Sequence, residues 1–254
     1  MDIPVCTNVY VPLRMAPTHK SEMGSQVLLG EKYEEVDHAG SYTRIKLLFD
    51  GYSGWIDNDH RSQFKASGDS ETFVIARDIT GSLPDGSSIF IPAGSEITGL
   101  EKNMREFTAG NLVIKTEKPV VLSPLEEELT FTALSYLNAP YLWGGRTSLG
   151  MDCSGLVQTV YKAHGINIPR DSFRQAEEGI TINLLSDAVP GDLLFFDNDA
   201  GRINHVGMLY DNGKIIHCSG KVRIDAIDHQ GIFRKEEKRY THRLRLIKRY
   251  REMP

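Results

Sequence analysis

Hydrophobic and polar residues alternate in short runs through the first half of the chain. Runs rich in β-branched and aromatic residues, separated by Gly, Pro, Asn and Asp, predict strands over residues 9–14, 25–30, 32–36, 43–49 and 54–56. A second series predicts strands over residues 72–76, 88–91, 96–100 and 111–115, with turn signals at 83–86 and 91–94. Strands of this length and spacing are typical of small β-barrels. The pattern predicts one barrel over residues 1–64 and a second over residues 65–123.

The pattern becomes helical after residue 123. Apolar residues at 125, 129, 133, 134 and 137 predict a helix over residues 124–137, opened by Ser123 as its cap. A second helix is predicted over residues 153–164. Strands follow over residues 192–196, 205–210 and 214–218, the last two joined as a hairpin, and a final strand lies within the basic stretch 235–250. Helices followed by antiparallel strands indicate an α+β domain over residues 124–254.

Composition narrows the class of protein and its partners. The chain has 254 residues, 40% of them hydrophobic and 25% charged, which suits two or three small globular domains. A net charge of −5 does not favour a nucleic-acid partner. Three cysteines fit neither a disulfide framework nor a zinc cluster, so neither a metal nor a cofactor is expected. The first residues lack a signal-like apolar core, and no run reaches transmembrane length. We therefore expect no membrane partner and a cytoplasmic location, or a periplasmic or secreted one if a signal has been removed.

Cys153 is the candidate nucleophile. It lies in the sequence GMDCSG (150–155), where a turn flanked by glycines leads into the predicted helix. A thiol at a helix N-terminus meets unpaired N–H groups and the positive end of the helix dipole, which favour the thiolate. The alternative is a small buried hydrophobic residue. The polar neighbours Asp152 and Ser154 favour the functional interpretation.

Two histidines could complete the chemistry. A thiol nucleophile needs a base, and the base needs a third group that orients it. His205 opens one strand of the predicted hairpin and His217 ends the other, so the two can lie side by side on one sheet face. Either histidine alone is more often structural, but together with Cys153 they predict a papain-like arrangement. The other histidines, including His242, are expected in turns or at helix ends.

Five ordered motifs carry a family resemblance. YLWGG (141–145), DCSG (152–155), PGDLLFF (190–196), HVG (205–207) and HCSG (217–220) together resemble the NlpC-type (NlpC/P60) peptidases over roughly residues 124–254. The first half is similar to the paired bacterial SH3-like barrels of γ-D-glutamyl-L-diamino acid endopeptidases. The resemblance implies an α+β, papain-like cysteine peptidase domain preceded by two small SH3-like β-barrels.

The resemblance also implies roles for the catalytic residues. Cys153 would be the nucleophile, His205 the base and His217 the residue that orients the base. The backbone N–H of Cys153 would contribute to the oxyanion hole, together with the hydroxyl of Tyr141. For Tyr141, packing in the core remains the alternative.

The same resemblance implies a substrate pocket beside the nucleophile. Asp171 would face the free amine of the substrate, and Ser154 and Ser172 would hydrogen-bond the peptide. Asp152 would line the pocket, while Arg170 would hold either Asp152 or a substrate carboxylate.

The first barrel would contribute two further residues to the pocket. Tyr52 would extend over the cleft, or be a turn aromatic, and Glu22 would be a second carboxylate for the amine, or a surface charge. The implied reaction is hydrolysis of the γ-D-glutamyl-L-diamino acid bond in murein peptides with a free N-terminal L-Ala, by a monomer acting in peptidoglycan recycling. An amidase or acyltransferase using the same three residues, and a non-catalytic wall-binding protein, remain alternatives.

Overall fold

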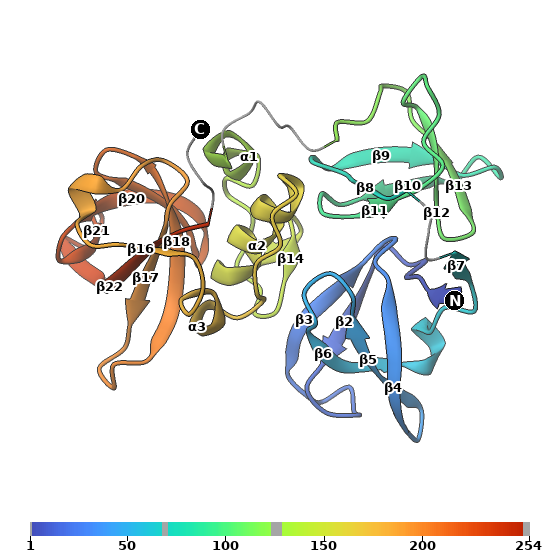
Figure 1. The fold of residues 1–254 in the computed structure, drawn as a ribbon, viewed down its shortest axis with the longest axis horizontal. Coiled ribbons are helices and arrows are strands. Elements are labelled where there is room, and N and C mark those ends of the chain that lie inside the picture. Colours follow the sequence, from blue (N-terminus) through green and yellow to red (C-terminus); the bar gives the residue numbers. More distant parts are fainter. Residues whose placement is uncertain (1, 68–70, 123–128, 251–254) are drawn as a thin grey trace. The chain divides into compact units, whose positions relative to one another are not determined.

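A computed structural model describes residues 2–67, 71–122 and 129–250 of the chain (Figure 1). The chain divides into two compact units, Met1–Leu125 with Lys162–Gly165, and Glu126–Tyr161 with Ile166–Pro254. Most elements of both units are strands. Among the residues described, no helix combines the length and apolar character that crossing a bilayer requires.

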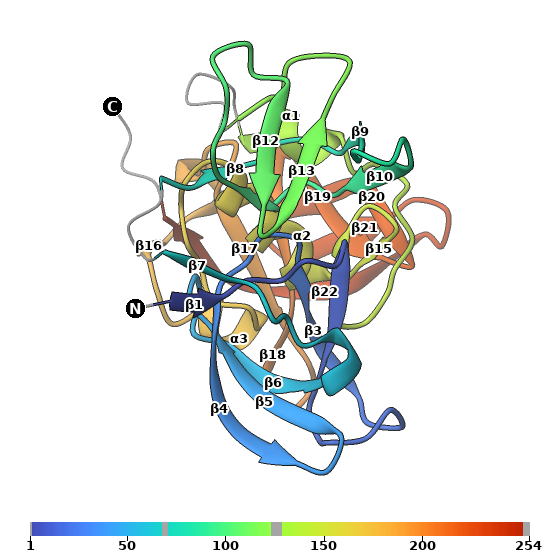
Figure 2. The same ribbon diagram turned by 90° about the vertical axis from the view of Figure 1, so that its right-hand side faces the viewer.

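The first unit begins with a five-stranded antiparallel sheet in the order β3-β2-β6-β5-β4 (Figure 2). Its elements are β1 (Asp2–Pro4), β2 (Tyr10–Arg14), β3 (Met23–Leu28), β4 (Tyr33–Ala39), β5 (Tyr42–Leu47), β6 (Ser53–Asp57), the 3-10 helix η1 (Asn58–His60) and β7 (Lys65–Ser67), which pairs with β1. Alternating apolar positions such as Val11, Leu13, Ile45 and Leu47 turn inward and form one core. All five strands predicted in this segment are present.

The rest of the first unit holds a second set of short strands. They are β8 (Phe73–Val74), β9 (Ile79–Ser82), β10 (Ser88–Ile91), β11 (Glu96–Ile97), β12 (Glu106–Ala109) and β13 (Leu112–Lys115). They form a four-stranded sheet, β10-β9-β13-β12, and the pair β11-β8 around a separate core that includes Ile91, Phe107 and Ile114. Strands β9 and β12 were not predicted. The division at residues 64 and 123 into three domains stays a prediction.

The α-helices of the described residues lie in the second unit, except that Lys162 and Ala163 at the end of α2 group with the first. Its elements before the main sheet are α1 (Leu129–Leu134), β14 (Arg146–Thr147), β15 (Gly150–Met151), α2 (Cys153–Ala163) and α3 (Ser172–Gln175). Part of the first predicted helix, residues 124–128, lies outside the described residues. Its predicted end at residue 137 is wrong, because the chain turns after Leu134 and Asn138 adopts a left-handed φ of 72°. Helix α2 begins at Cys153, as predicted.

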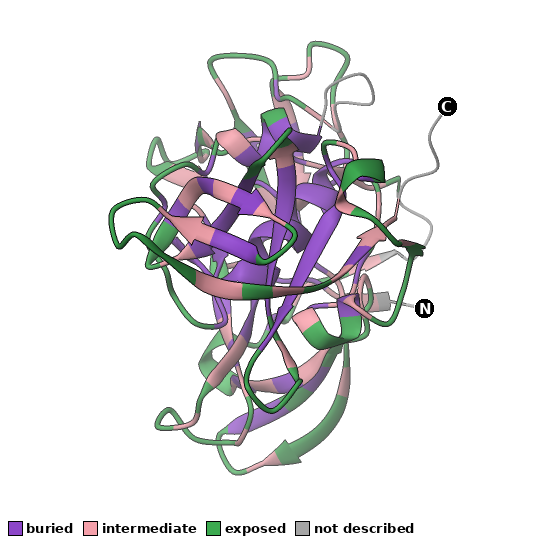
Figure 3. Ribbon diagram, turned by 90° about the vertical axis from the view of Figure 1, so that its left-hand side faces the viewer, coloured by how far each residue is buried: buried purple, intermediate pink, exposed green. Residues whose placement is uncertain are grey.

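A seven-stranded antiparallel sheet forms the larger part of the second unit. Its strands are β16 (Ile180–Ile182), β17 (Leu193–Asp197), β18 (Ile203–Asp211), β19 (Lys214–Ser219), β20 (Lys221–Asp228), β21 (Gly231–Arg234) and β22 (Arg239–Arg249), with the 3-10 helix η2 (Leu185–Asp187) between β16 and β17. The order is β16-β22-β17-β18-β19-β20-β21, and β21 pairs back with β22, so the strands from β17 to β22 close into a ring. Figure 3 shows buried positions concentrated on the central strands. Leu194, Phe196, Ile215 and Ile232 belong to the apolar core.

Candidate active site

Cys153 stands at the first position of helix α2, directly after the short β14–β15 hairpin. Gly155, two residues further on, brings the helix against the backbone just before β14, since a Cβ there would lie 2.2 Å from the carbonyl oxygen of Gly145. The Cys153 side chain is buried. The local sequence therefore fixes the thiol at a helix start that is pressed against backbone.

A buried ion pair lies beside the thiol. The Arg170 guanidinium donates to Asp152 through two hydrogen bonds, Nη2 to Oδ2 at 2.7 Å and Nη1 to Oδ1 at 3.0 Å, and Nη1 also donates to Ser154 Oγ at 2.8 Å. The Asp152 carboxylate also accepts the backbone N–H groups of Gly144 at 2.8 Å and Gly155 at 2.7 Å. Of the two partners considered for Arg170, the structure shows Asp152.

Asp171 and Ser172 follow this pair along the chain. Asp171 caps helix α3 with extended backbone angles, and its carbonyl oxygen accepts the N–H of Gln175 at 2.9 Å. Ser172 is the first residue of α3, and both side chains are partly exposed. Binding of a substrate amine by Asp171 stays a prediction.

The β18–β19 hairpin brings the two predicted histidines together. His205 Nε2 lies 2.9 Å from His217 Nδ1, and His217 Nε2 lies 3.0 Å from Asp225 Oδ2 on β20. Gly207 lies opposite His217 in the ladder, and a Cβ at that position would come within 2.8 Å of the His217 Cβ. The glycine of the HVG motif therefore makes room for the second histidine. All three polar side chains of this series are buried.

Strand β18 also reaches the nucleophile, because the backbone N–H of Val206, next to His205, donates to the Cys153 sulfur. Burial, reinforced by the nearby Asp152 carboxylate, raises the pKa of the Cys153 thiol to about 12, although the Val206 hydrogen bond, Arg170 and the Ser154 N–H act to lower it. The expected thiolate at the helix start is therefore not the resting form. Burial, His217 and His242 hold the His205 pKa well below its ordinary value, so thiol and imidazole are both neutral at rest.

Tyr141 lies close to the nucleophile and keeps its phenolic proton. Burial raises the pKa of its hydroxyl, and the nearby Cys153 and Asp152 raise it further. The residue as a whole is 37% exposed, so the alternative of core packing is wrong. A protonated hydroxyl near the sulfur is a suitable hydrogen-bond donor for an oxyanion.

Two residues near the histidines have positions that the sequence analysis did not predict. His242 was expected in a turn or at a helix end, but it lies in β22 with its ring stacked on that of His205, the centroids 4.1 Å apart. Burial lowers the pKa of His242 to about 4. Asp225 was not considered, although the alternating pattern of residues 221–228 is itself a strand signal. With that strand assigned, Asp225 becomes a candidate partner for the hairpin histidines.

Tyr52 and Glu22 belong to the first unit. The Tyr52 N–H donates to Asp50 Oδ1 at 2.9 Å in a tight turn, and its hydroxyl lies 3.8 Å from Met15 Sδ. The Glu22 side chain is exposed. Their contribution to a substrate pocket stays a prediction. Within residues 2–67, 71–122 and 129–250, no three His, Cys, Asp or Glu side chains are grouped to hold a metal ion.

Known proteins resemble both units. Residues 138–242 match the NlpC/P60 family, and residues 13–60 match the bacterial dipeptidyl-peptidase Sh3 domain. A γ-D-glutamyl-L-lysine dipeptidyl-peptidase of Bacillus cereus is 29% identical over 79% of this chain and 68% of its own length. A protein of the same name from Bacillus subtilis is 43% identical over a shared stretch that makes up 36% of this chain and 31% of that relative.

A solved structure shares the fold along the whole chain. The crystal structure of an NlpC/P60 family protein from Bacillus cereus covers 98% of this chain and 99% of its own, with a TM-score of 0.81 and 21% identity. At that identity the similarity concerns the fold.

Proposed function

We propose that this chain, whose residues 138–242 match the NlpC/P60 family and whose residues 13–60 match the bacterial dipeptidyl-peptidase Sh3 domain, is a cysteine peptidase acting on peptidoglycan peptides. The proposed reaction is hydrolysis of the γ-D-glutamyl-L-diamino acid bond in peptides with a free N-terminal L-Ala, as in peptidoglycan recycling. The observation that carries the proposal is the thiol of Cys153 hydrogen-bonded to β18 immediately beside His205, which is paired with His217.

The proposed arrangement is papain-like, because a helix carries the cysteine and a sheet carries the histidine. His205 takes the Cys153 proton as the sulfur attacks the γ-carbonyl carbon of D-glutamate. The Cys153 N–H and the Tyr141 hydroxyl donate to the resulting oxyanion. His205 then gives the proton to the leaving amine, and water hydrolyses the thioester to release the dipeptide.

The pocket side chains divide into two groups under this proposal. The buried Arg170 is engaged by Asp152 and Ser154, which supports a role in shaping the pocket wall rather than in binding a substrate carboxylate. Asp171 is partly exposed and is proposed to face the substrate amine. A carboxylate in this place selects against peptides whose amine is blocked, because the blocked form brings no positive charge to it.

The test compares L-Ala-γ-D-Glu-L-Lys with its diaminopimelate counterpart and with N-acetylated forms of both. The wild type should release L-Ala-γ-D-Glu, and Cys153→Ala should release none. Cys218→Ala is the matched control and should stay active, because the Cys218 thiol is buried, donates to the Met151 carbonyl and has no part in the proposed chemistry. Turnover by Cys153→Ala would overturn the mechanism, and equal cleavage of acetylated peptide would overturn amine selection. Transfer of the dipeptide to an added amine in preference to water would identify an acyltransferase. Binding to murein without any cleavage would identify a wall-binding protein.

A further inference from the structure

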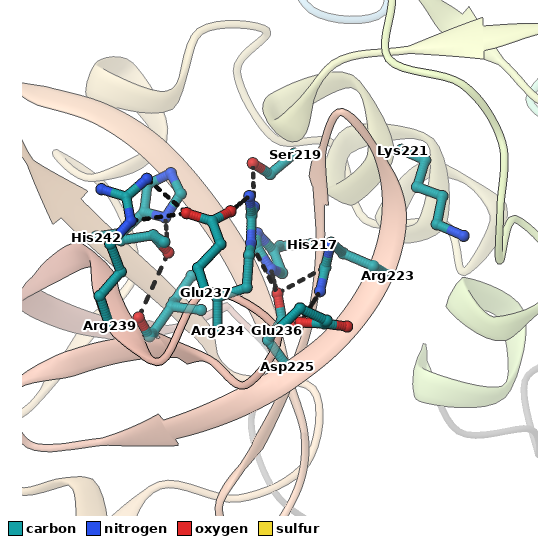
Figure 4. A network of polar contacts seen from close by, with 12 residues as sticks. His217, Ser219, Lys221, Arg223, Asp225, Arg234, Glu236, Glu237, Arg239 and His242 are labelled. Carbon is teal, nitrogen blue, oxygen red and sulfur yellow. Dashed lines mark hydrogen bonds and ion pairs between the residues drawn. The ribbon is translucent and has the colours of Figure 1, made fainter.

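We infer that Asp225 is a positioning residue that sets the tautomer of both histidines and leaves His205 Nδ1 free to accept a proton. The inference rests on the proposed function, in which Cys153 and His205 perform the chemistry. Figure 4 shows Asp225 between His217 and two arginines, Arg223 and Arg234. Strand β20 supplies Asp225, so the residue comes from outside the β18–β19 hairpin that carries the histidines.

The pairing of hydrogen-bond donors and acceptors fixes the tautomers of the two histidines. An ionised carboxylate only accepts hydrogen bonds, so the 3.0 Å contact with Asp225 requires the proton of neutral His217 to be on Nε2. His217 Nδ1 then carries a lone pair and must accept, so the 2.9 Å contact requires the proton of His205 to be on Nε2. His205 Nδ1 is consequently unprotonated. If the hydrogen bonds ran in the opposite direction, the proton of His205 would be on Nδ1, and His205 could not act as the base through that nitrogen.

The surroundings of Asp225 keep its carboxylate ionised and fixed. Arg223 Nη2 donates to Oδ1 at 2.8 Å, and Arg223 Nε lies 2.7 Å from Oδ2. Arg234 Nε lies 4.0 Å from the same Oδ2. Burial works against the charged form, but the hydrogen bonds from His217 and Arg223 outweigh it and lower the pKa of Asp225 to about 2.

The arginines are themselves held in place by further partners. Arg223 Nη2 donates to Glu236 at 3.0 Å, while Arg234 donates to Glu237 at 2.6 Å and to Ser219 Oγ at 2.9 Å. Asp225 therefore has a fixed geometry at both oxygens. The competing interpretation is that Asp225 serves only to compensate these two partly buried cations.

Asp225→Asn separates the two interpretations. The amide has nearly the same shape but can donate as well as accept, so His217 and His205 can adopt the reverse tautomers in part of the molecules. We expect kcat to fall roughly 10- to 100-fold with KM within about twofold, taking the range found for residues that orient a metal-ligating histidine. Asp228→Asn on the same strand is the matched control, since its carboxylate accepts from Tyr240 and not from a histidine, and should keep wild-type activity.

The direct readout is ¹⁵N NMR of the histidine side chains, which distinguishes the two neutral tautomers. The wild type should show His217 and His205 protonated at Nε2, and Asp225→Asn should show a mixture at His217. A wild-type His217 protonated at Nδ1 would overturn the inference even if no variant folds. Loss of kcat with unchanged tautomers would mean a purely structural role. If the wild type cleaves no murein peptide, the proposed function fails, while the tautomer measurement still tests Asp225.

Discussion

Replacement of Arg170 by Met should destabilise the second unit strongly. The change keeps an apolar stem of similar length but removes the guanidinium that donates to Asp152 and Ser154. The Arg170 and Asp152 side chains are only 1% and 8% exposed, so water cannot solvate the Asp152 carboxylate in place of the lost guanidinium. The variant therefore leaves a buried carboxylate without its cation.

The size of the effect follows from what remains around that carboxylate. Breaking a buried ion pair by removing one partner typically costs roughly 3–5 kcal/mol. Asp152 keeps the hydrogen bonds from the Gly144 and Gly155 N–H groups, which stabilise its charge. We therefore expect a loss in the free energy of unfolding near the lower end of that range, about 3 kcal/mol. Since Arg170 also lowers the pKa of Cys153, its removal should raise that pKa and reduce turnover.

The assay is urea unfolding at neutral pH, followed by circular dichroism. Arg239→Met is the control in the same unit, because Arg239 and Glu237 form an exposed pair with side chains 67% and 32% accessible. Such pairs contribute about 0–1 kcal/mol. The double change Asp152→Asn with Arg170→Met should recover part of the loss, since it removes the unpaired charge. An Arg170→Met loss no larger than that of Arg239→Met would refute the reasoning.

Two further predictions concern neighbouring residues. Because burial holds the His242 pKa at about 4 and its ordinary value is 6.5, the unfolded chain takes up a proton at a higher pH than the native protein does. His242 therefore lowers the free energy of unfolding as the pH falls from about 6.5 to about 4. His242→Phe should make the urea midpoint less dependent on pH in this range, and an unchanged pH dependence of the midpoint would contradict this. Gly155→Ala should cost about 1–3 kcal/mol in thermal or urea unfolding, because its Cβ would lie 2.2 Å from a backbone oxygen of Gly145. A neutral effect would show that the Gly145 backbone can move aside.

Much of the central site could be predicted because it depends on local sequence. The turn at residues 211–214 requires a left-handed residue, and Gly213 supplies it with a φ of 73°. Once that hairpin is assigned, period-two alternation puts His205 and His217 on one face. The start of helix α2 at Cys153 follows in the same way from the glycine-flanked turn.

The positions of His242 and Asp225 depend on pairings between distant strands. His242 reaches His205 only because β22 pairs with both β17 and β21 and so closes the ring. Periodicity tells which face of its own strand a residue lies on, but not which other strand lies beside it. The stacking of His242 on His205 could therefore not be predicted from the sequence. Asp225 was missed for a simpler reason, since the alternation of residues 221–228 was left unassigned.

The protonation state of Cys153 shows where a local argument is insufficient. The Ser154 N–H at the helix start does lower the pKa of the Cys153 thiol, but the larger effect is burial, which raises it. The surroundings of the thiol include strand β18, whose Val206 N–H donates to it and which lies outside the short motif around the cysteine. A neutral thiol makes the reaction depend on a base that is unprotonated at the right nitrogen. The direction of the hydrogen bonds from Asp225 through His217 to His205 therefore matters more for this site than the dipole of helix α2.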